Sequence, residues 1–477
     1  MNDSSAPARI AASPAGWPLA ATRYGPIALL AIVVAVLAWL PYEVGPSARL
    51  VGAAVLIAFI IASWAFNLLG EPSTSLVFLL LAILFRLAKP EVVLSGFVSP
   101  AWWLVFGGSI TAIAVQTTGF GRRLARLFFA RAGDSYPRAV TAVALAAVGL
   151  AFLMPSTGGR VLLLTPIVMA FAEHLGLTPD RPGYTGLIVT VAAASFMPAT
   201  AILPANVPNS ILLGAAQAQY GIELTYGPYL LLHFPVLGVL KTILLIWLVC
   251  RLFPERGRLT PETQRDPGKM SRDEKTLAVL LGLSLVLFAT DFLHGVSPAW
   301  ISLGTGLLCL LPPVGVISTK TFSEKFNLAP IFYIGSILGV GAVVADSGLG
   351  ERVSSGLLHW ANLTSGDTLA NMAKLAAIGA GITPLVTATG APAVLTPLAR
   401  EFAAASGLPL LTVLMLQVPI FSTVFLPFES PPMVIALQLG GINMRAAGKF
   451  CLALAAITVV VLLPLDYLWW ELLGYLP

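Results

Sequence analysis

FLMPSTGGRVLLLTP, residues 152–166, is an apolar stretch that a short Pro/Ser/Thr/Gly segment breaks near its middle. A second broken stretch, MPATAILPANVPNSILLG, follows at residues 197–214. The pattern recurs in the second half as ITPLVTATGAPAVLTP (382–397) and FLPFESPPMVIALQLGG (425–441). Non-helical backbone at membrane depth persists only where it is packed in protein or lines a wet cavity. Two halves that each carry a pair of interrupted membrane segments are typical of a secondary transporter.

Composition places the chain in a lipid bilayer. Of the 477 residues, 57% are hydrophobic and only 10% are charged, and the mean hydropathy is +0.88. Soluble domains carry about 25% charged residues, so we predict an all-α polytopic membrane protein. The net charge of +5 does not indicate nucleic-acid binding, because basic residues also gather in the cytoplasmic loops of membrane proteins.

Motifs for enzymatic or metal chemistry are missing from the sequence. It contains no GxxxxGK[ST] nucleotide-binding loop and no H-E-x-x-H or paired-Asp arrangement. The cysteines Cys250, Cys309 and Cys451 are far apart and fit no metal or redox spacing. We therefore expect a protein that is not an enzyme and needs no cofactor beyond a coupling ion.

The apolar windows predict about eleven transmembrane helices plus two re-entrant hairpins. The hairpins cover about 138–172 and 369–404, and two broken helices cover about 186–219 and 409–440. The uninterrupted spans lie near residues 26–41, 50–69, 73–88, 97–118, 228–252, 274–293, 298–312, 326–345 and 447–470.

The basic residues predict the orientation in the membrane. If the N-terminus is inside, nineteen of the 27 Lys and Arg residues fall in cytoplasmic segments and six fall outside. The remaining two, Arg160 and Lys241, lie within apolar segments. This excess follows the positive-inside rule and predicts a multi-pass protein of the inner membrane with its N-terminus cytoplasmic and its C-terminus outside.

An internal repeat supports this arrangement. WLVFGGSITAIAVQTTGFGRRLARLFFARAG (103–133) parallels APIFYIGSILGVGAVVADSGLGERVSSGLLHW (329–360), and the predicted topology puts the amphipathic parts on opposite faces. Equivalent elements on opposite faces indicate an inverted repeat. The expected domains are a disordered cytoplasmic tail (1–25), a first inverted repeat (26–253), a cytoplasmic linker (254–273) and a second inverted repeat (274–477).

From about Pro26 onward, this order of elements resembles the divalent anion/sodium symporter family, whose members carry dicarboxylates, citrate or sulfate. The resemblance implies a homodimer in which a transport domain moves like an elevator against a scaffold domain. It also implies that hairpin tips and broken-helix loops form two cation sites with a substrate site between them. Members of that family carry Ser-Asn-Thr at each tip and a Pro-Pro-Asn-like sequence in each loop.

The matching segments of this chain depart from those motifs. The tips read Ser-Thr-Gly at 156–158 and Thr-Ala-Thr at 387–389, and the loops read Ala-Asn-Val-Pro-Asn at 205–209 and Glu-Ser-Pro-Pro-Met at 429–433. The resemblance therefore carries over the fold and architecture, whereas the coupling ion and the substrate stay open.

The tips are suited to anions. A hairpin tip places the N-terminus of its second arm at mid-membrane, where free N–H groups and the positive end of the helix dipole favour an anion. The predicted substrate-binding residues are Ser156, Thr157, Gly158, Arg160, Asn206, Pro208, Thr387, Thr389, Gly390, Ser430 and Pro431. The predicted sodium or proton sites comprise Ser156, Thr157, Ala205, Thr387, Ala388 and Glu429.

Two charged residues at membrane depth stand out. An arginine at mid-membrane costs on the order of 2.5–3.5 kcal/mol, so Arg160 needs an anionic partner or a wet cavity. Arg160 grips a substrate carboxylate or sulfate, or pairs with Glu429, or extends to the cytoplasmic surface. Glu429 is our candidate for proton coupling, because a carboxylate shielded from water holds its proton more readily. Backbone carbonyls at the tips still allow sodium coupling.

Other ionisable residues are expected to be structural. Lys241 and His233 share the sixth span; Lys241, near its centre, could reach the cavity, and a structural pairing or a water contact at the domain interface is the expectation. Asp291, His294, Asp346 and Asp466 lie at predicted ends of spans, where no functional role is expected.

These observations predict a secondary active transporter of small anions, di- or tricarboxylate or sulfate-like, that works by elevator-type alternating access and is coupled to sodium or protons. The alternatives are an anion exchanger or uniporter without cation coupling, or a channel or sensor on the same fold. The expected partners are a small anionic substrate, the lipid bilayer and a second copy of the chain, with no nucleic acid.

Overall fold

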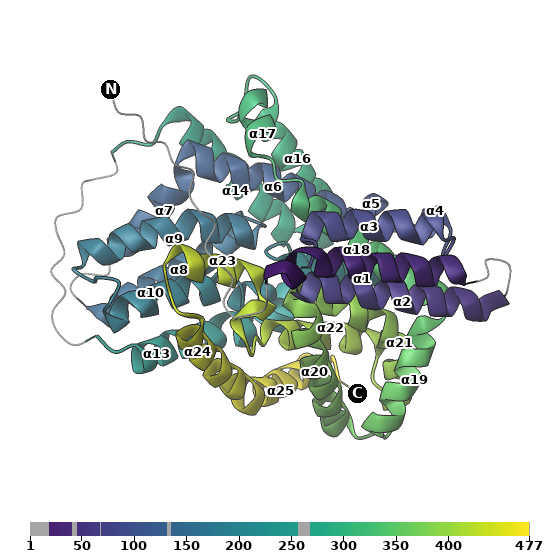
Figure 1. Ribbon diagram of the computed structural model, residues 1–477. Coiled ribbons are helices and arrows are strands. Elements are labelled where there is room, and N and C mark those ends of the chain that lie inside the picture. Colours follow the sequence, from purple (N-terminus) through teal and green to yellow (C-terminus); the bar gives the residue numbers. More distant parts are fainter. Residues whose placement is uncertain (1–18, 41–44, 67, 131–134, 256–267, 477) are drawn as a thin grey trace.

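The computed structural model describes residues 19–40, 45–66, 68–130, 135–255 and 268–476, which fold into helices without a β-strand (Figure 1). The elements of the first half are α1 (Leu19–Trp39), α2 (Gly45–Phe66), α3 (Glu71–Leu84), α4 (Pro90–Val93), α5 (Ser95–Val98), α6 (Pro100–Thr118), α7 (Phe120–Phe129), α8 (Tyr136–Leu153), α9 (Thr157–His174), α10 (Pro182–Ala194), η1 (Pro198–Ala201), α11 (Val207–Tyr220), α12 (Tyr226–His233), η2 (Phe234–Leu240) and α13 (Lys241–Leu252). Those of the second half are α14 (Arg272–Ala289), α15 (Asp291–His294), α16 (Pro298–Leu310), α17 (Thr319–Lys325), α18 (Ala329–Asp346), α19 (Leu349–Ala361), α20 (Thr368–Leu395), η3 (Thr396–Leu398), α21 (Ala399–Ser406), α22 (Leu410–Ser422), η4 (Pro427–Glu429), α23 (Pro431–Leu439), α24 (Met444–Ile457), η5 (Thr458–Leu462) and α25 (Leu463–Leu472).

The helices identify a multi-pass membrane protein. Within the described residues, seven helical segments are long and apolar enough to cross a membrane, or eight if the bent pair α6 and α7 counts as one span. Four shorter apolar helices accompany them, including α3, α16 and α22. The prediction of eleven spans counted these shorter helices as full spans. It also counted α14, whose first four residues are all charged.

The same order of elements occurs in both halves. α6 ends at Gly119, where φ is 84°, and the chain turns by 68° into the amphipathic helix α7. α18 is likewise followed by Gly348, where φ is 73°, and then by α19. Glycine adopts this left-handed backbone without the steric cost of a Cβ atom. In each half a helix with a central break and then a second broken helix follow.

The two halves are interleaved (Figure 1). α1, α2 and α3 form a layer beside α18, which belongs to the second half. At the other side of the molecule, α23 packs against α9 and α10 of the first half. In the middle, α20 packs against α11 and α22. Each broken helix therefore contacts elements of the opposite half.

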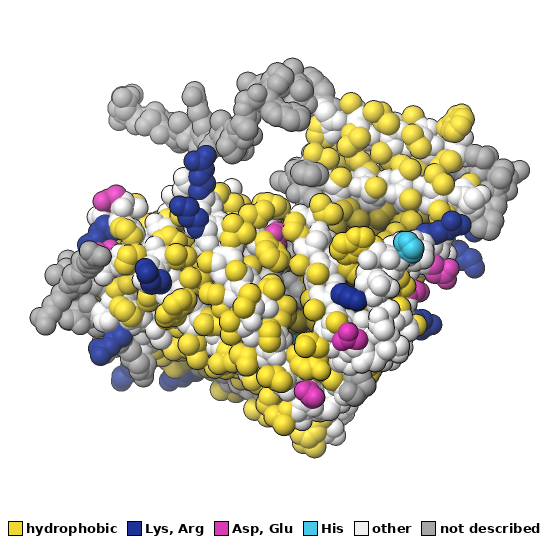
Figure 2. Space-filling view, turned by 90° about the horizontal axis from the view of Figure 1, so that it is seen from below, with side chains coloured by type: hydrophobic (Ala, Val, Ile, Leu, Met, Phe, Trp, Pro, Cys, Tyr) yellow, Lys and Arg dark blue, Asp and Glu magenta, His cyan; other side chains and the backbone are white. Residues whose placement is uncertain are grey.

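One face of the molecule is broadly apolar. Figure 2 shows hydrophobic side chains over the middle of this face, with most charged side chains toward its left and right margins. Across the molecule as a whole, apolar residues that are largely exposed, such as Val460, Val279 and Leu80, suit contact with lipid.

Two predicted segments are only partly described. The tail was expected to be disordered over residues 1–25, but α1 begins at Leu19, because residues 19–25 continue into the apolar helix and include good helix formers. Residues 1–18 lie outside the described residues. The linker was expected at 254–273; its residues 256–267 lie outside the described residues, and α14 begins at Arg272.

Candidate functional site

The first hairpin tip lies between α8 and α9. α8 ends at Leu153 and α9 begins at Thr157, so the break falls within the Pro/Ser/Thr/Gly segment. The hydroxyl of Ser156 caps α9 by accepting a hydrogen bond from the Gly159 N–H at 3.2 Å. Ser156 and Gly158 are half-buried, and no atom lies within 4 Å of the place that a Cβ atom of Gly158 would take. The tip therefore has open space beside its backbone.

The first broken helix lies directly against this tip. α10 ends at Ala194, η1 follows, and α11 begins at Val207 with Asn206 as the preceding residue. The loop is held by the Asn209 amide, which donates to the carbonyls of Thr200 and Ile202 at 3.0 and 2.7 Å. Pro208 is buried in the first turn of α11.

Arg160 joins the tip to the broken helix. Its guanidinium is fully buried and contacts only oxygen atoms of neutral groups. Nη1 donates to the carbonyls of Met154 and, at 2.9 Å, Ala205; Nη2 donates to the carbonyl of Ser195 at 2.7 Å, to Asn206 Oδ1 at 2.9 Å and to Thr157 Oγ1 at 3.1 Å. Met154 directly follows α8 and Ser195 directly follows α10, so two helix C-termini point their negative ends at this cation.

These contacts bear on the three roles that the sequence left open for Arg160. Extension to the cytoplasmic surface is wrong, because the side chain is 0% exposed. The ion pair with Glu429 is not formed, since no carboxylate of the described residues contacts Arg160. Direct grip on a substrate stays a prediction, although both terminal nitrogens already have partners and only Nε lacks one. The sequence could not reveal this, because the acceptors are backbone carbonyls.

The second hairpin tip is strained. Thr387 interrupts α20 with φ 62° and ψ 161°, a backbone region that is otherwise essentially restricted to glycine. Ala388 and Gly390 are buried, whereas Thr389 is half-buried. Such strain costs on the order of 1–3 kcal/mol and persists only where the surrounding structure imposes it. The kink places the start of the second arm of α20 at Thr387, as the sequence pattern indicated.

The second broken helix contains Glu429. Its carboxylate is fully buried and accepts hydrogen bonds from the backbone N–H groups of Phe425 and Leu426 at 3.3 and 3.0 Å. The hydroxyl of Ser430 is buried without a hydrogen-bond partner, and α23 begins at Pro431. An unpartnered buried hydroxyl is costly, so Ser430 is available to a ligand.

The helices that carry the four interruptions contact one another. The first tip meets the first loop through Arg160, and α11, which starts at that loop, packs against α20. α20 also packs against η4 in the second loop, and α23, which starts there, packs against α9. The predicted substrate and cation residues are therefore distributed over elements that contact one another, instead of being dispersed at the lipid surface.

Two buried charges were given no site role by the sequence. Lys241, 1% exposed, donates to the carbonyl and the hydroxyl of Ser422 at 2.7 and 3.0 Å. Asp466 was expected at the end of a span, but it is 2% exposed and neither carboxylate oxygen has a hydrogen-bond partner. The sequence could have indicated this burial, because Asp466 lies inside the apolar run 447–470. His233 is fully buried, with its ring 4.6 Å from that of Tyr229.

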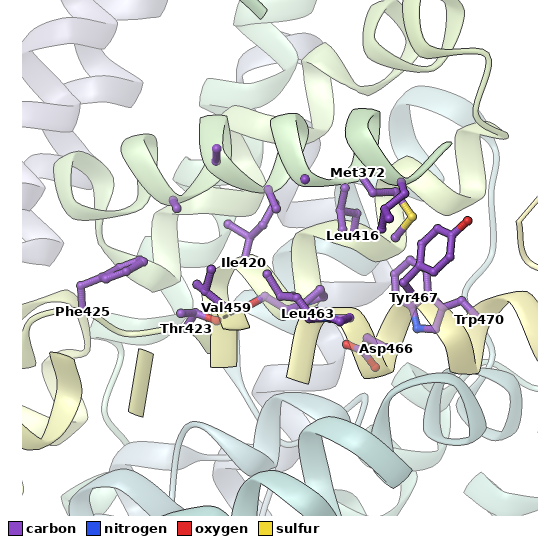
Figure 3. A pocket seen from close by; sticks show the side chains of 17 residues that line it. Met372, Leu416, Ile420, Thr423, Phe425, Val459, Leu463, Asp466, Tyr467 and Trp470 are labelled. Atoms are coloured by element: carbon purple, nitrogen blue, oxygen red, sulfur yellow. Dashed lines mark hydrogen bonds between the residues drawn. The ribbon is translucent and has the colours of Figure 1, made fainter. Parts of the chain in front are cut away.

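A cavity of about 450 Å³ lies between α20, α22 and α25 (Figure 3). It is lined mainly by apolar side chains such as Met372, Leu416 and Ile420, with Thr423 and Asp466 among the few polar ones. None of the predicted substrate-binding residues lines it. This cavity is therefore distinct from the predicted anion site. Within the described residues no group of three or more His, Cys, Asp or Glu side chains could hold a metal ion.

Comparisons with known proteins agree on transport. A family model described as the sodium:sulfate symporter transmembrane region matches residues 18–476. The sodium-dependent dicarboxylate transporter SdcS of Staphylococcus saprophyticus is 23% identical over 431 residues, which cover 84% of this chain and 82% of that protein. The L-tartrate/succinate antiporter of Escherichia coli is 24% identical over 269 residues, which cover 53% of this chain and 54% of that protein.

Two further comparisons concern coverage and fold. A membrane protein of Cupriavidus necator is 24% identical over 292 residues, which span 60% of this chain and 57% of that relative. Among solved structures, the YdaH transporter of Alcanivorax borkumensis superposes with a TM-score of 0.55 at 16% identity, covering 91% of this chain and 99% of that one. At this identity the likeness concerns the fold alone.

Proposed function

Since this chain belongs to the sodium:sulfate symporter family, we propose that it is a secondary active transporter of small dicarboxylates that works by elevator-type alternating access. The protein then acts in the inner membrane as a homodimer, with its N-terminus in the cytoplasm and its C-terminus outside. Tricarboxylates and sulfate are the other substrates that this site chemistry would accept.

One observation carries the proposal for an anion. Thr157 Oγ1, at the first residue of α9, donates to Oδ1 of Asn206, which immediately precedes α11, at 2.5 Å. Two helix N-termini therefore adjoin inside the protein, and each presents free N–H groups and a partial positive charge. The open space beside Gly158 gives a ligand direct access to this backbone. A carboxylate is a natural ligand at such a position.

The second half supplies further donors. Thr387 and Thr389 carry hydroxyls at the second tip, and Ser430 carries a buried hydroxyl without a partner at the start of α23. The packing of α23 on α9 and of α20 on α11 supports a shared site for donors from both halves. A solute with two carboxylates, one for each half, fits this arrangement. The names of the relatives, a dicarboxylate transporter and a tartrate/succinate antiporter, agree with this class.

Glu429 is the candidate for coupling to protons. Its buried carboxylate faces two backbone N–H groups in the second loop, so protonation would change the charge beside the second tip without any further cation. The competing candidate is anion exchange without cation coupling, which the name of the antiporter relative favours.

Uptake of labelled succinate into proteoliposomes tests the function. A carrier gives saturable uptake that is accelerated when unlabelled succinate is loaded inside. Linear, non-saturating flux without counterflow would indicate a channel, and absence of flux for succinate, citrate and sulfate would contradict the proposal. A thermal-shift screen with the same anions, with sodium or potassium present, gives an independent measure of binding, since ligands stabilise the folded state they bind.

A further inference from the structure

Two buried side-chain cations, both from the first half of the sequence, lie at corresponding points of the two broken helices. Arg160 Nη2 donates to the carbonyl of Ser195, and Lys241 Nζ donates to the carbonyl of Ser422, both at 2.7 Å. Ser195 directly follows α10 and Ser422 ends α22, and these are the 13-residue first parts of the two broken helices. A buried cation therefore sits at the interrupted C-terminal end of each broken helix.

Helix C-termini within a membrane need such a cation. The last carbonyls of a helix have no intrahelical donor and carry a partial negative charge. No water is available in the hydrocarbon core to satisfy them. In secondary transporters, half-helix C-termini and unwound carbonyls commonly coordinate the sodium ion or proton that drives transport.

The surroundings of Arg160 have the composition of a cation cage. Five oxygen atoms face the guanidinium, three from backbone carbonyls and two from the side chains of Thr157 and Asn206. All five are neutral, and the side chain is completely buried. This is the kind of ligand set that hard alkali and alkaline-earth cations prefer.

Lys241 lies at the second helix end and contacts two oxygen atoms of one residue, compared with five oxygens around Arg160. Its ammonium bonds both the carbonyl and the hydroxyl of Ser422 and is 1% exposed. Asp466 attracts Lys241 electrostatically, but the two do not form a salt bridge. Figure 3 shows Asp466 on α25, on the side away from Met372 and Leu416. Oxygen atoms of the α22 terminus are thus the direct partners of this cation as well.

We infer that Arg160 and Lys241 occupy the two places at which a coupling sodium ion would otherwise be bound, so that anion transport by this protein is independent of sodium. The inference rests on the proposed function and specifies how its site is charged. A sodium ion cannot enter either place while the side chain is there, because the oxygen ligands are taken and like charges repel at short range.

The first test measures thermal stability of the purified wild-type protein in NaCl, KCl and choline chloride at equal ionic strength. We expect the same unfolding temperature in all three salts, and a ratio of about 1 between uptake rates in sodium and in choline. A saturable stabilisation specific to sodium, or uptake that requires sodium, would overturn the inference.

The second test removes the two side-chain cations, so that their oxygen partners become available to sodium. In Arg160→Ala and Lys241→Ala the vacated oxygens should bind sodium, which would appear as a saturable upward shift of about 2 °C or more that choline does not produce. The matched controls Arg181→Ala and Lys374→Ala remove cations that also donate to a backbone carbonyl at 2.7 Å but lie at the surface, and they should show no shift. Folded Arg160→Ala protein without a sodium response contradicts the inference.

Both tests are independent of transport. If neither variant folds, the wild-type comparison still decides. If the wild type is insensitive to sodium and the vacated variants bind it, but no anion is transported, the proposed function fails while the assignment of Arg160 and Lys241 stands.

Discussion

Thr157 and Asn206 are joined by a side-chain hydrogen bond of 2.5 Å, and both also accept from Arg160. This contact couples the first residue of α9 to the residue that precedes α11. The relative position of the first hairpin and the first broken helix therefore depends on three side chains from two separate interruptions.

Removing the amide of Asn206 should loosen that junction. Asn206→Ala deletes the acceptor for Thr157 and Arg160 and the donor to the Phe196 carbonyl. Leaving a buried charged donor short of a partner costs about 1–3 kcal/mol, so we expect a lower unfolding temperature and a loss of succinate binding. Asn327→Ala, at an exposed turn, is the control and should leave binding unchanged. Wild-type affinity in Asn206→Ala would contradict the role of this junction.

A second prediction concerns the strain at Thr387. Thr387→Gly should raise stability by about 1 kcal/mol, because glycine relieves a strain of about 1–3 kcal/mol and loses about 0.5–1 kcal/mol through its greater freedom in the unfolded chain. Thr389→Gly, two residues later in the helix, should instead lower stability, by roughly 0.3–0.5 kcal/mol of helix propensity. If the Thr387 hydroxyl binds the anion, the more stable variant will also bind succinate more weakly. Chemical denaturation and ligand titration measure the two effects separately.

The open space at Gly158 allows a separation of folding from binding. A Cβ atom at this position meets no atom within 4 Å, so Gly158→Ala should fold with equal or slightly higher stability, by up to about 1 kcal/mol. The added methyl group should nevertheless raise the KM for succinate, because it covers the N–H groups at the start of α9. Gly304→Ala, in an equally open position of α16, should leave KM unchanged. An unaltered KM in Gly158→Ala would place the substrate elsewhere.

Glu429 provides a test of coupling. In Glu429→Gln the side chain keeps its shape and loses the ability to exchange a proton, so uptake driven by a proton gradient should fall to the rate seen without a gradient. Exchange of internal for external succinate should continue. Glu324→Gln, an exposed residue near Lys320, serves as the control and should retain the gradient effect. A gradient-driven rate that survives in Glu429→Gln would exclude this residue as the proton site.

A further prediction concerns the boundary between the linker and the second half. Glu274 receives hydrogen bonds from Arg123 at 3.0 Å on both carboxylate oxygens and closes a capping box with Ser271. Glu274→Gln weakens the pair with Arg123 and should therefore lower the unfolding temperature. The expected loss in the free energy of unfolding is about 1 kcal/mol or less, the value for an ion pair near the surface. Addition of salt should reduce the difference from the wild type. Equal stability of both proteins at low salt would show that this pair contributes nothing.

Much of the architecture follows from the sequence because interruptions leave a local signature. The Pro/Gly/Ser/Thr segments at 154–156 and around Thr387 mark the breaks that the structure contains, since these residues weaken an apolar helix. The membership in a transporter family is confirmed. The number of spans stays a prediction, because short apolar helices such as α3 and α22 cannot be distinguished from full spans by hydropathy.

The partners of charged side chains could not be predicted. For Arg160 the sequence left a substrate anion, Glu429 and the cytoplasmic surface open; its acceptors in the structure are mostly main-chain oxygens, which every residue type supplies equally. Lys241 finds Ser422 across 181 residues of chain, and no local pattern reports such a contact. Asp466 was predicted to lie at the end of a span, because it is far from the middle of its apolar run. In the structure the packing of α25 buries it.

Cations that are side chains of the protein, such as Arg160 and Lys241, change how the membrane voltage acts on transport. A side chain returns with the protein at the end of every transport cycle, whereas a sodium ion would be released on the far side. Over a complete cycle Arg160 and Lys241 thus contribute no net charge movement, and the membrane voltage acts only on the solute and on any proton that moves with it. An inside-negative potential of 100 mV opposes the entry of each negative charge by about 2.3 kcal/mol. Accumulation of a divalent anion therefore requires a second anion leaving in return or protons entering with it.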